Sequence, residues 1–249
     1  MREDGDLYVD KTKPIAQFLA GSETYQRSIF TRPRKFGKSL VLDIMAEMLC
    51  AGEFPEGVPA WREYTPVDVE KMFGGLEVHD MIMRGDASLG DLFRCPRFVI
   101  QLDLGDITTG SDMALSIKNK LSDHAGSYFG PEAEALLVRL RDPTVGDVLC
   151  ELISFVPKEI EVCILVDEHD AAILQDIGRE HWDKAQGGLD SLKSLMMVTK
   201  NHICGPRISH FIVTEVARLA IKSLFSGANN FTDFTYSEIV SKMFGFRED

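Results

Sequence analysis

The stretch Ser28–Leu42 decides the fold; it reads Ser-Ile-Phe-Thr-Arg-Pro-Arg-Lys-Phe-Gly-Lys-Ser-Leu-Val-Leu. Four strand-forming residues, Ser28–Thr31, lead into a tight loop that ends in Gly-Lys-Ser. Apolar residues then recur at the spacing of one helix face, at Leu40, Val41, Ile44, Met45, Met48 and Leu49. A strand, a loop, Gly-Lys-Ser and a helix in this order are typical of a phosphate-binding loop, or P-loop.

One position departs from the strict P-loop pattern. The motif G-x-x-x-x-G-K-S has its first glycine five residues before the second, and Arg32 occupies that position ahead of Gly37. From this stretch alone, a chance Gly-Lys-Ser at the start of a helix stays open as the alternative.

The charge balance limits the kinds of partner. A formal net charge of -12 over 249 residues argues against a broad nucleic-acid surface, which needs clustered Lys and Arg, but leaves nucleic acid open as a local ligand. The densest basic run is Arg32, Arg34, Lys35 and Lys38, which is enough for one polyphosphate. A protein partner or a second copy of the chain also stays open.

The cysteines predict a reducing compartment. All five are widely spaced, without a C-x-x-C pair, so we expect reduced core thiols rather than a zinc site or disulfides. No apolar run approaches the length of a membrane span, and the charged first residues do not resemble a signal peptide. We therefore expect an intracellular, cytoplasmic protein, with a nuclear location left open, and no membrane.

Further apolar runs predict the rest of a sheet. Strands are expected at Phe98–Asp103, Val162–Val166 and His210–Thr214, with a weak fifth at Phe231–Tyr236. Helices are expected at 14–20, 111–128, 131–140, 145–156 and 189–200. Continuous rather than alternating apolarity indicates strands covered on both faces. The predicted fold class is α/β, a P-loop NTPase three-layer sandwich with a mostly parallel sheet of about five strands.

The domain parse is a single P-loop domain over residues 1–249. An irregular insertion is expected at about 53–97, packed on the outside of the sheet and containing a short helix between Thr65 and Leu76.

Phosphate binding needs convergent backbone N–H groups, a helix N-terminus and a cation. Lys38 is expected to reach the β- and γ-phosphates, and Ser39 to bind Mg²⁺. The N–H groups and side chains that bind the nucleotide are expected from Arg34, Lys35, Phe36, Gly37, Lys38, Ser39 and Leu40.

The run Ile164-Leu165-Val166-Asp167-Glu168 predicts the metal and water chemistry. In P-loop NTPases an acidic residue at the end of a buried strand holds the metal, and a neighbouring carboxylate can activate water. Asp167 is therefore the expected Mg²⁺ ligand, through water, and Glu168 the general base. The alternative, a strand that simply runs into a polar loop, weakens once the P-loop is considered beside it.

Other polar residues follow strands, where ligands bind in open α/β sheets. Thr214 is a candidate for positioning water near the γ-phosphate, with a strand-ending Thr of no special role as the alternative. Arg218 is either an arginine sensor or a solvated surface residue. Asp103, His169 and Asp170 also follow strands, and Asp103 is a candidate supporting residue.

The sequence resembles the AAA-ATPase-like domains, predicted P-loop ATPases often fused to a restriction-endonuclease-like nuclease domain. The matching stretches, in order, are Tyr8–Thr12, Arg32–Ser39, Leu165–Asp170, Leu224–Asn230 and Phe244–Phe246. In this family an Arg at the first-glycine position is the usual form. The resemblance implies an additional-strand sheet in which the P-loop strand is flanked by the Asp-Glu (Walker B) strand and the sensor strand.

The resemblance implies Mg²⁺-dependent ATP binding and hydrolysis, with ATP and Mg²⁺ as cofactors. Two residues depart from the family pattern: His169 stands where Tyr is common, and Glu215 where Gly usually follows the strand-ending Thr. Because the sequence ends at Asp249, just after the last matching stretch, we expect neither a helical lid nor a nuclease domain in it. A nucleotide-dependent switch or recognition module with slow turnover, and a truncated inactive domain, stay open as alternatives.

Overall fold

A five-stranded sheet forms the centre of the protein. The computed structural model describes residues 9–21, 23–54, 56, 67–108, 112–216 and 229–245. The strands are β1 (Arg27–Thr31), β2 (Phe98–Asp103), β3 (Val162–Asp167), β4 (Ile208–Glu215) and β5 (Thr232–Asp233). They lie in the order β2-β3-β4-β1-β5, and every pair is parallel. The predicted α/β class and parallel sheet are confirmed.

The side chains of the strands alternate between two hydrophobic cores, one on each face. Ile29 and Ile164 belong to one core, whereas Phe30, Cys163 and Leu165 belong to the other. This alternation follows the two-residue repeat of a strand, and both faces are buried because helices cover both.

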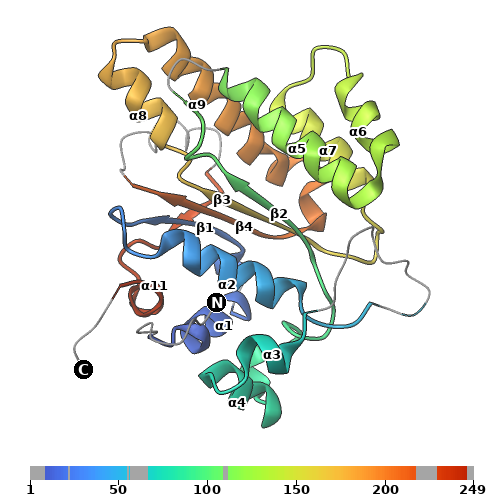
Figure 1. Ribbon diagram of the computed structural model, residues 1–249, viewed down its shortest axis with the longest axis vertical. Helices are drawn as coiled ribbons and strands as arrows, with labels where there is room; N and C mark the ends of the chain where they lie inside the picture. Colours follow the sequence, from blue (N-terminus) through green and yellow to red (C-terminus); the bar gives the residue numbers. More distant parts are fainter. Residues whose placement is uncertain are drawn as a thin grey trace.

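The helices form the two outer layers (Figure 1). The first core lies under α5 (Met113–Phe129), α7 (Val145–Phe155) and α9 (Trp182–Met197), with α6 (Pro131–Val138) beside them. The second core lies under α1 (Thr12–Leu19), α2 (Lys38–Cys50) and α11 (Glu238–Met243). The three-layer arrangement is therefore as expected.

The expected order of the strands was wrong. The resemblance implied that β1 lies between the Asp-Glu strand β3 and the sensor strand. Strand β4, which carries Thr214, is a neighbour of β1, but the other neighbour is β5 and not β3. Strand β4 separates β1 from β3, and seven of its eight residues are buried. Such continuous burial requires a central position with neighbours on both sides and helices on both faces.

Most predicted helices occur near the expected residues, because their end signals are strong. In α7, Thr144 and Asp147 form a reciprocal capping box. Helix α8 (Ala171–Gly178) was not predicted. Helix α9 begins at Trp182, seven residues before the predicted start at Leu189. The prediction started too late because the first turns contain Gly187 and Gly188, and glycine has a low helix propensity.

In the region expected to be an insertion, α3 (Val69–Phe73) lies within the range of the expected short helix, and a second helix, α4 (Glu77–Met83), was not predicted. Helix α4 is fastened to the start of α1. Asp10 Oδ2 accepts a bond from the Glu77 N–H at 2.7 Å, and Thr12 Oγ1 accepts one from the Val78 N–H at 3.2 Å. These bonds give Asp10 and Thr12 a structural role.

All five cysteines are free thiols; Cys163 and Cys204 are buried, and the other three are half-buried. Within the described part of the chain, every helix is too short or too polar to cross a bilayer.

Candidate functional site

The loop between β1 and α2 has the backbone form of an anion-binding turn. Lys35 and Gly37 both take the left-handed conformation, with φ of 65° and 76°. Helix α2 begins at Lys38, and the Val41 N–H donates to the Gly37 carbonyl at 3.0 Å. The amides of the first turn before Val41 therefore point out of the helix N-terminus, where the helix dipole favours an anion.

Lys38 lies under this loop and is only 4% exposed. Its Nζ donates to the Pro33 carbonyl at 3.3 Å and lies 4.0 Å from Glu168 Oε1. A buried ammonium group is costly unless it has polar partners, so the loop carbonyl and the carboxylate hold it in place.

Asp167, at the end of β3, joins three segments of the chain. Its Oδ2 accepts a hydrogen bond from Ser39 Oγ at 2.5 Å, and its Oδ1 accepts one from Thr214 Oγ1. Ser39 comes from α2 and Thr214 from β4, so the fold brings together three residues separated widely in sequence. Thr214 was expected beside a terminal phosphate, and its hydroxyl donates to Asp167.

The oxygen atoms of Ser39 and Asp167 are suited to a hard cation. Mg²⁺ prefers oxygen ligands and keeps several waters, so it needs only one or two protein ligands together with phosphates. Among the described residues, no group of three His, Cys, Asp or Glu side chains forms a candidate metal cluster. The pair Ser39–Asp167 therefore fits a magnesium ion held partly by a phosphate ligand.

Glu168 follows the strand in a strained conformation, with φ of 49°, and its side chain is 31% exposed. It lies against the turn after β2. A Cβ atom placed on Gly105 would be 2.7 Å from Glu168 Oε2 and 3.2 Å from Asp103 Oδ1. The Gly105 N–H donates to that Asp103 oxygen at 2.8 Å. The missing side chain at Gly105 thus makes room for the Glu168 carboxylate beside Asp103.

His169 and Asp170 are buried and bind the end of β4. His169 Nδ1 donates to the Thr214 carbonyl at 3.0 Å, and burial lowers the pKa of the imidazole. Both Asp170 carboxylate oxygens accept from the Val216 N–H, at 3.1 and 3.0 Å. These two residues fix the β3–α8 turn against β4, and Arg218 lies outside the described residues.

Glu215 is fully buried and connects β4 to the end of β1 and the start of the β1–α2 loop. Its Oε1 accepts from the Thr31 hydroxyl, its carbonyl accepts from the Arg32 N–H at 3.0 Å, and its Oε2 lies 3.5 Å from His169 Nε2. The two departures from the family pattern, His169 and Glu215, are therefore neighbours in space.

Arg32 directs its guanidinium at Thr235 and Phe244. Nη1 donates to the Thr31 carbonyl at 2.9 Å and to the Thr235 carbonyl at 2.6 Å. The guanidinium carbon lies 5.4 Å from the centre of the Phe244 ring, and partial burial lowers the pKa of the group. Arg32 thus binds residues 231–245, which we name the C-terminal segment.

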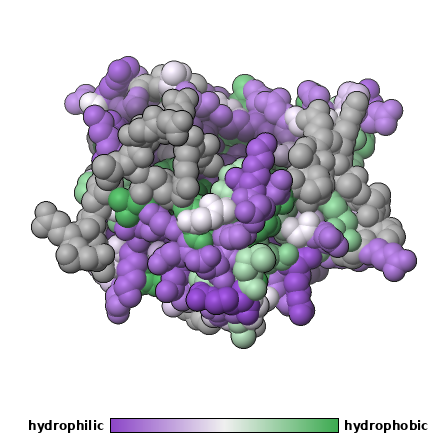
Figure 2. Space-filling view, turned by 60° about the horizontal axis from the view of Figure 1, so that its bottom comes forward, coloured by the Kyte–Doolittle hydropathy of each residue, from purple (hydrophilic) through white to green (hydrophobic). Residues whose placement is uncertain are grey.

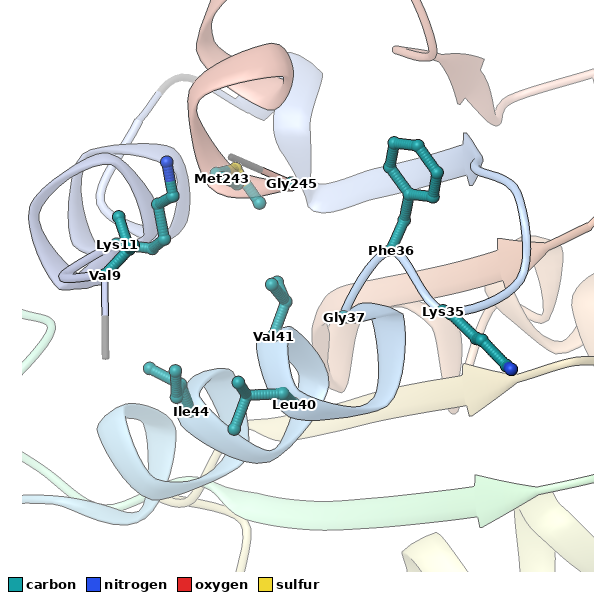
Figure 3. A pocket seen from close by; sticks show the side chains of 10 residues that line it. All are labelled: Val9, Lys11, Lys35, Phe36, Gly37, Leu40, Val41, Ile44, Met243 and Gly245. Carbon is teal, nitrogen blue, oxygen red and sulfur yellow. The ribbon is translucent and has the colours of Figure 1, made fainter. Parts of the chain in front are cut away.

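A pocket of about 430 Å³ lies beside the β1–α2 loop (Figure 3). Its lining comes from four parts of the chain: the start of α1, the loop, α2 and the C-terminal segment. The residues are Val9, Lys11, Lys35, Phe36, Gly37, Leu40, Val41, Ile44, Met243 and Gly245. The Lys35 side chain points away from the other labelled side chains, and most of the remaining lining residues are apolar (Figure 3).

Sequence reasoning missed the pocket residues Val9, Lys11, Met243 and Gly245. A signal for them existed, since two of the stretches that carry the family resemblance, Tyr8–Thr12 and Phe244–Phe246, contain or adjoin them. Neither stretch contains an obvious catalytic group, so neither was assigned to a site.

The molecular surface seen from the side of α1 and α4 is mainly hydrophilic (Figure 2). Hydrophobic residues on this face form small patches between charged and polar ones (Figure 2).

Comparison with known proteins supports the interpretation of the P-loop region. The model of the family described as "Predicted AAA-ATPase" matches residues 1–55. The resemblance to the AAA-ATPase-like family is confirmed there. This AAA-ATPase-like stretch contains β1, the loop and α2.

One relative extends the similarity beyond residue 55. Over all 249 residues the chain is 28% identical to a protein of Azotobacter chroococcum mcd 1 named "Uncharacterized protein in vnfD 5'region". The chain spans 41% of that protein's length. No solved structure matches the chain significantly.

Proposed function

We propose that this protein binds ATP with Mg²⁺ at the P-loop and hydrolyses it. The observation that carries the proposal is the meeting of Ser39, Asp167 and Thr214 at the N-terminus of α2, with Lys38 beneath the same loop. A helix N-terminus attracts phosphate, the lysine adds a cation, and the oxygen pair supplies a magnesium site. The family match over residues 1–55 supports the assignment to nucleotide chemistry.

The apolar pocket is suited to the base and ribose of the nucleotide. Its volume of about 430 Å³ lies in the usual range for small-molecule pockets, and it adjoins the loop at Phe36 and Gly37. Leu40, Val41 and Met243 offer apolar contacts to a flat base. The phosphates would then extend from the pocket along the loop toward Lys38.

Each proposed catalytic residue has one task. Lys38 stabilises charge on the β- and γ-phosphates, and the amides of residues 34–40 orient them. Glu168 accepts a proton from the attacking water, and its place beside Gly105 sets the direction of its carboxylate. Thr214 holds Asp167 in position through its hydroxyl. When bound, Mg²⁺ neutralises phosphate charge, and Ser39 and Asp167 are the residues that would hold it.

A turnover assay combined with thermal unfolding tests this proposal. ATP with Mg²⁺ should raise the melting temperature, because a ligand that binds only the folded state stabilises it. Glu168→Gln should keep this rise and lose phosphate release. If ATP with Mg²⁺ produced neither stabilisation nor phosphate release in the wild type, the proposal would be wrong.

A nucleotide-dependent switch with slow turnover is the second candidate. The observation that favours it is the pairing of Lys38 Nζ with Glu168 Oε1 at 4.0 Å, because a carboxylate directed at the lysine is less free to turn toward an attacking water. In such a switch, ATP affinity would match that of an active ATPase, and Glu168→Gln would change the slow turnover very little.

A further inference from the structure

The C-terminal segment, residues 231–245, is attached to the P-loop at several points. Two neighbouring residues bind Thr235. The Thr31 N–H donates to Thr235 Oγ1 at 3.0 Å, and Arg32 Nη1 donates to the Thr235 carbonyl. Farther along the segment, Phe244 lies under the Arg32 guanidinium and packs against Phe30 at a ring distance of 5.8 Å. The segment is therefore held by β1 and the loop, and also by α1, since α11 packs against α1 and the Phe234 ring lies 6.1 Å from the Phe18 ring.

The same segment forms one wall of the apolar pocket. Met243 and Gly245 line it, and Gly245 lies against the Phe36 ring, since a Cβ on Gly245 would be 3.5 Å from Phe36 Cδ1. Two loop residues, Arg32 and Phe36, thus hold the end of the segment beside the pocket. The amides proposed to face a phosphate belong to residues 34–40, whereas the hydrogen bonds to Thr235 are made by Thr31 and Arg32.

We propose that Arg32 is a specificity-determining positioning residue, which closes the base pocket by holding the C-terminal segment against the loop. Its side chain performs this task in the place where the strict P-loop motif has glycine. This inference rests on the proposed nucleotide site. It predicts that Arg32 raises the affinity of the site for the base and ribose and does not affect the affinity for the phosphates.

The test compares ATP with inorganic triphosphate, each with Mg²⁺, by calorimetry. The wild type should bind ATP more tightly than triphosphate, because only ATP fills the pocket. Arg32→Gly, which restores the strict motif, should lower ATP affinity by about tenfold or more and leave triphosphate affinity nearly unchanged. A merely structural role would weaken both ligands alike.

Two further variants keep the test decisive if Arg32→Gly does not fold. Arg32→Lys keeps the charge but loses the planar guanidinium, whose Nη1 donates to both carbonyls, and Phe244→Leu removes the ring beneath the guanidinium. Both should lower the ratio of ATP affinity to triphosphate affinity. Arg34→Gly serves as the contrast, because an exposed loop arginine should weaken ATP and triphosphate equally and leave the ratio unchanged.

The outcomes separate this inference from the function on which it rests. A wild type that binds neither ligand contradicts the nucleotide site itself. A wild type that prefers ATP, with the same preference retained in Arg32→Gly or in both substitute variants, overturns only the role of Arg32. Equal wild-type affinity for ATP and triphosphate also overturns it, because the pocket would then contribute no affinity.

Discussion

Substitution of Gly105 by Ala should impair turnover without unfolding the protein. The new Cβ would lie 2.7 Å from Glu168 Oε2, so the carboxylate has to move by about 0.7 Å to reach an ordinary contact of 3.4 Å. Gly105 does not have a positive φ, and the clashing atom is the end of a flexible side chain. The free energy of unfolding should therefore change by less than about 1 kcal/mol.

The effect on catalysis should be much larger. A displacement of about 1 Å in a catalytic group can cost roughly 100-fold in rate, so we expect turnover to fall by roughly 10- to 100-fold. ATP affinity should stay close to that of the wild type, because the atoms nearest to the new Cβ belong to Glu168 and Asp103 and not to the loop. Single-turnover phosphate release and calorimetry measure the two quantities separately.

A matched control and a double variant make the result interpretable. Gly187→Ala places a methyl group on an open face of α9, where no atom lies within 4 Å, and should leave turnover unchanged. Gly105→Ala combined with Glu168→Gln should be no slower than Glu168→Gln alone, since both act through one carboxylate. Wild-type turnover in Gly105→Ala, or an additional loss in the double variant, would refute the proposed role of Gly105.

Three more predictions concern the metal site, the core and the effect of pH. Ser39→Ala should abolish most of the gain in ATP affinity that Mg²⁺ provides and leave Mg²⁺-free binding intact; an unchanged Mg²⁺ dependence by calorimetry would exclude Ser39 as a ligand. Asp170→Ala removes both acceptors of the Val216 N–H and should lower the free energy of unfolding in urea by at least about 1 kcal/mol, whereas Asp170→Asn should cost less. Burial lowers the pKa of His210 to about 4 from 6.5, so between these values only the unfolded chain binds the proton. His210 should therefore contribute a loss of about 2 kcal/mol in stability between pH 7 and pH 5, and His210→Gln should reduce that loss; identical pH dependence in both proteins would contradict the assignment.

Local patterns predicted most of the sheet. Strands β2 and β3 occur within one residue of the predicted bounds, because each is a mainly apolar run that ends in Asp, with β2 interrupted only by Gln101. Helix α8 was missed, since Ala171–Gly178 is a short run that periodicity alone cannot distinguish from a loop or strand. The order of the strands was wrong because no local pattern records which strands are neighbours.

Contacts between distant residues could be expected from the sequence where a motif relates the two residues, and could not be expected where none does. Ser39 and Asp167, 128 residues apart, were both predicted to bind one Mg²⁺ ion, and the structure places the two side chains in contact. No comparable rule links Arg32 to Thr235 across 203 residues. The position of Gly105 beside Glu168 depends on the exact path of the turn after β2, which composition and periodicity do not determine.

The most direct test of the nucleotide site is calorimetric titration of wild type and Lys38→Ala with ATP and Mg²⁺. Lys158→Ala is the control. This exposed lysine precedes β3 and so lies near the N-terminal ends of the parallel strands, whereas the loop lies at their C-terminal ends. We predict that Lys38→Ala weakens ATP binding by at least about 30-fold, as expected for the loss of a buried charge that contacts phosphate, and that Lys158→Ala binds as the wild type does. Equal affinity in the wild type and Lys38→Ala would contradict the account.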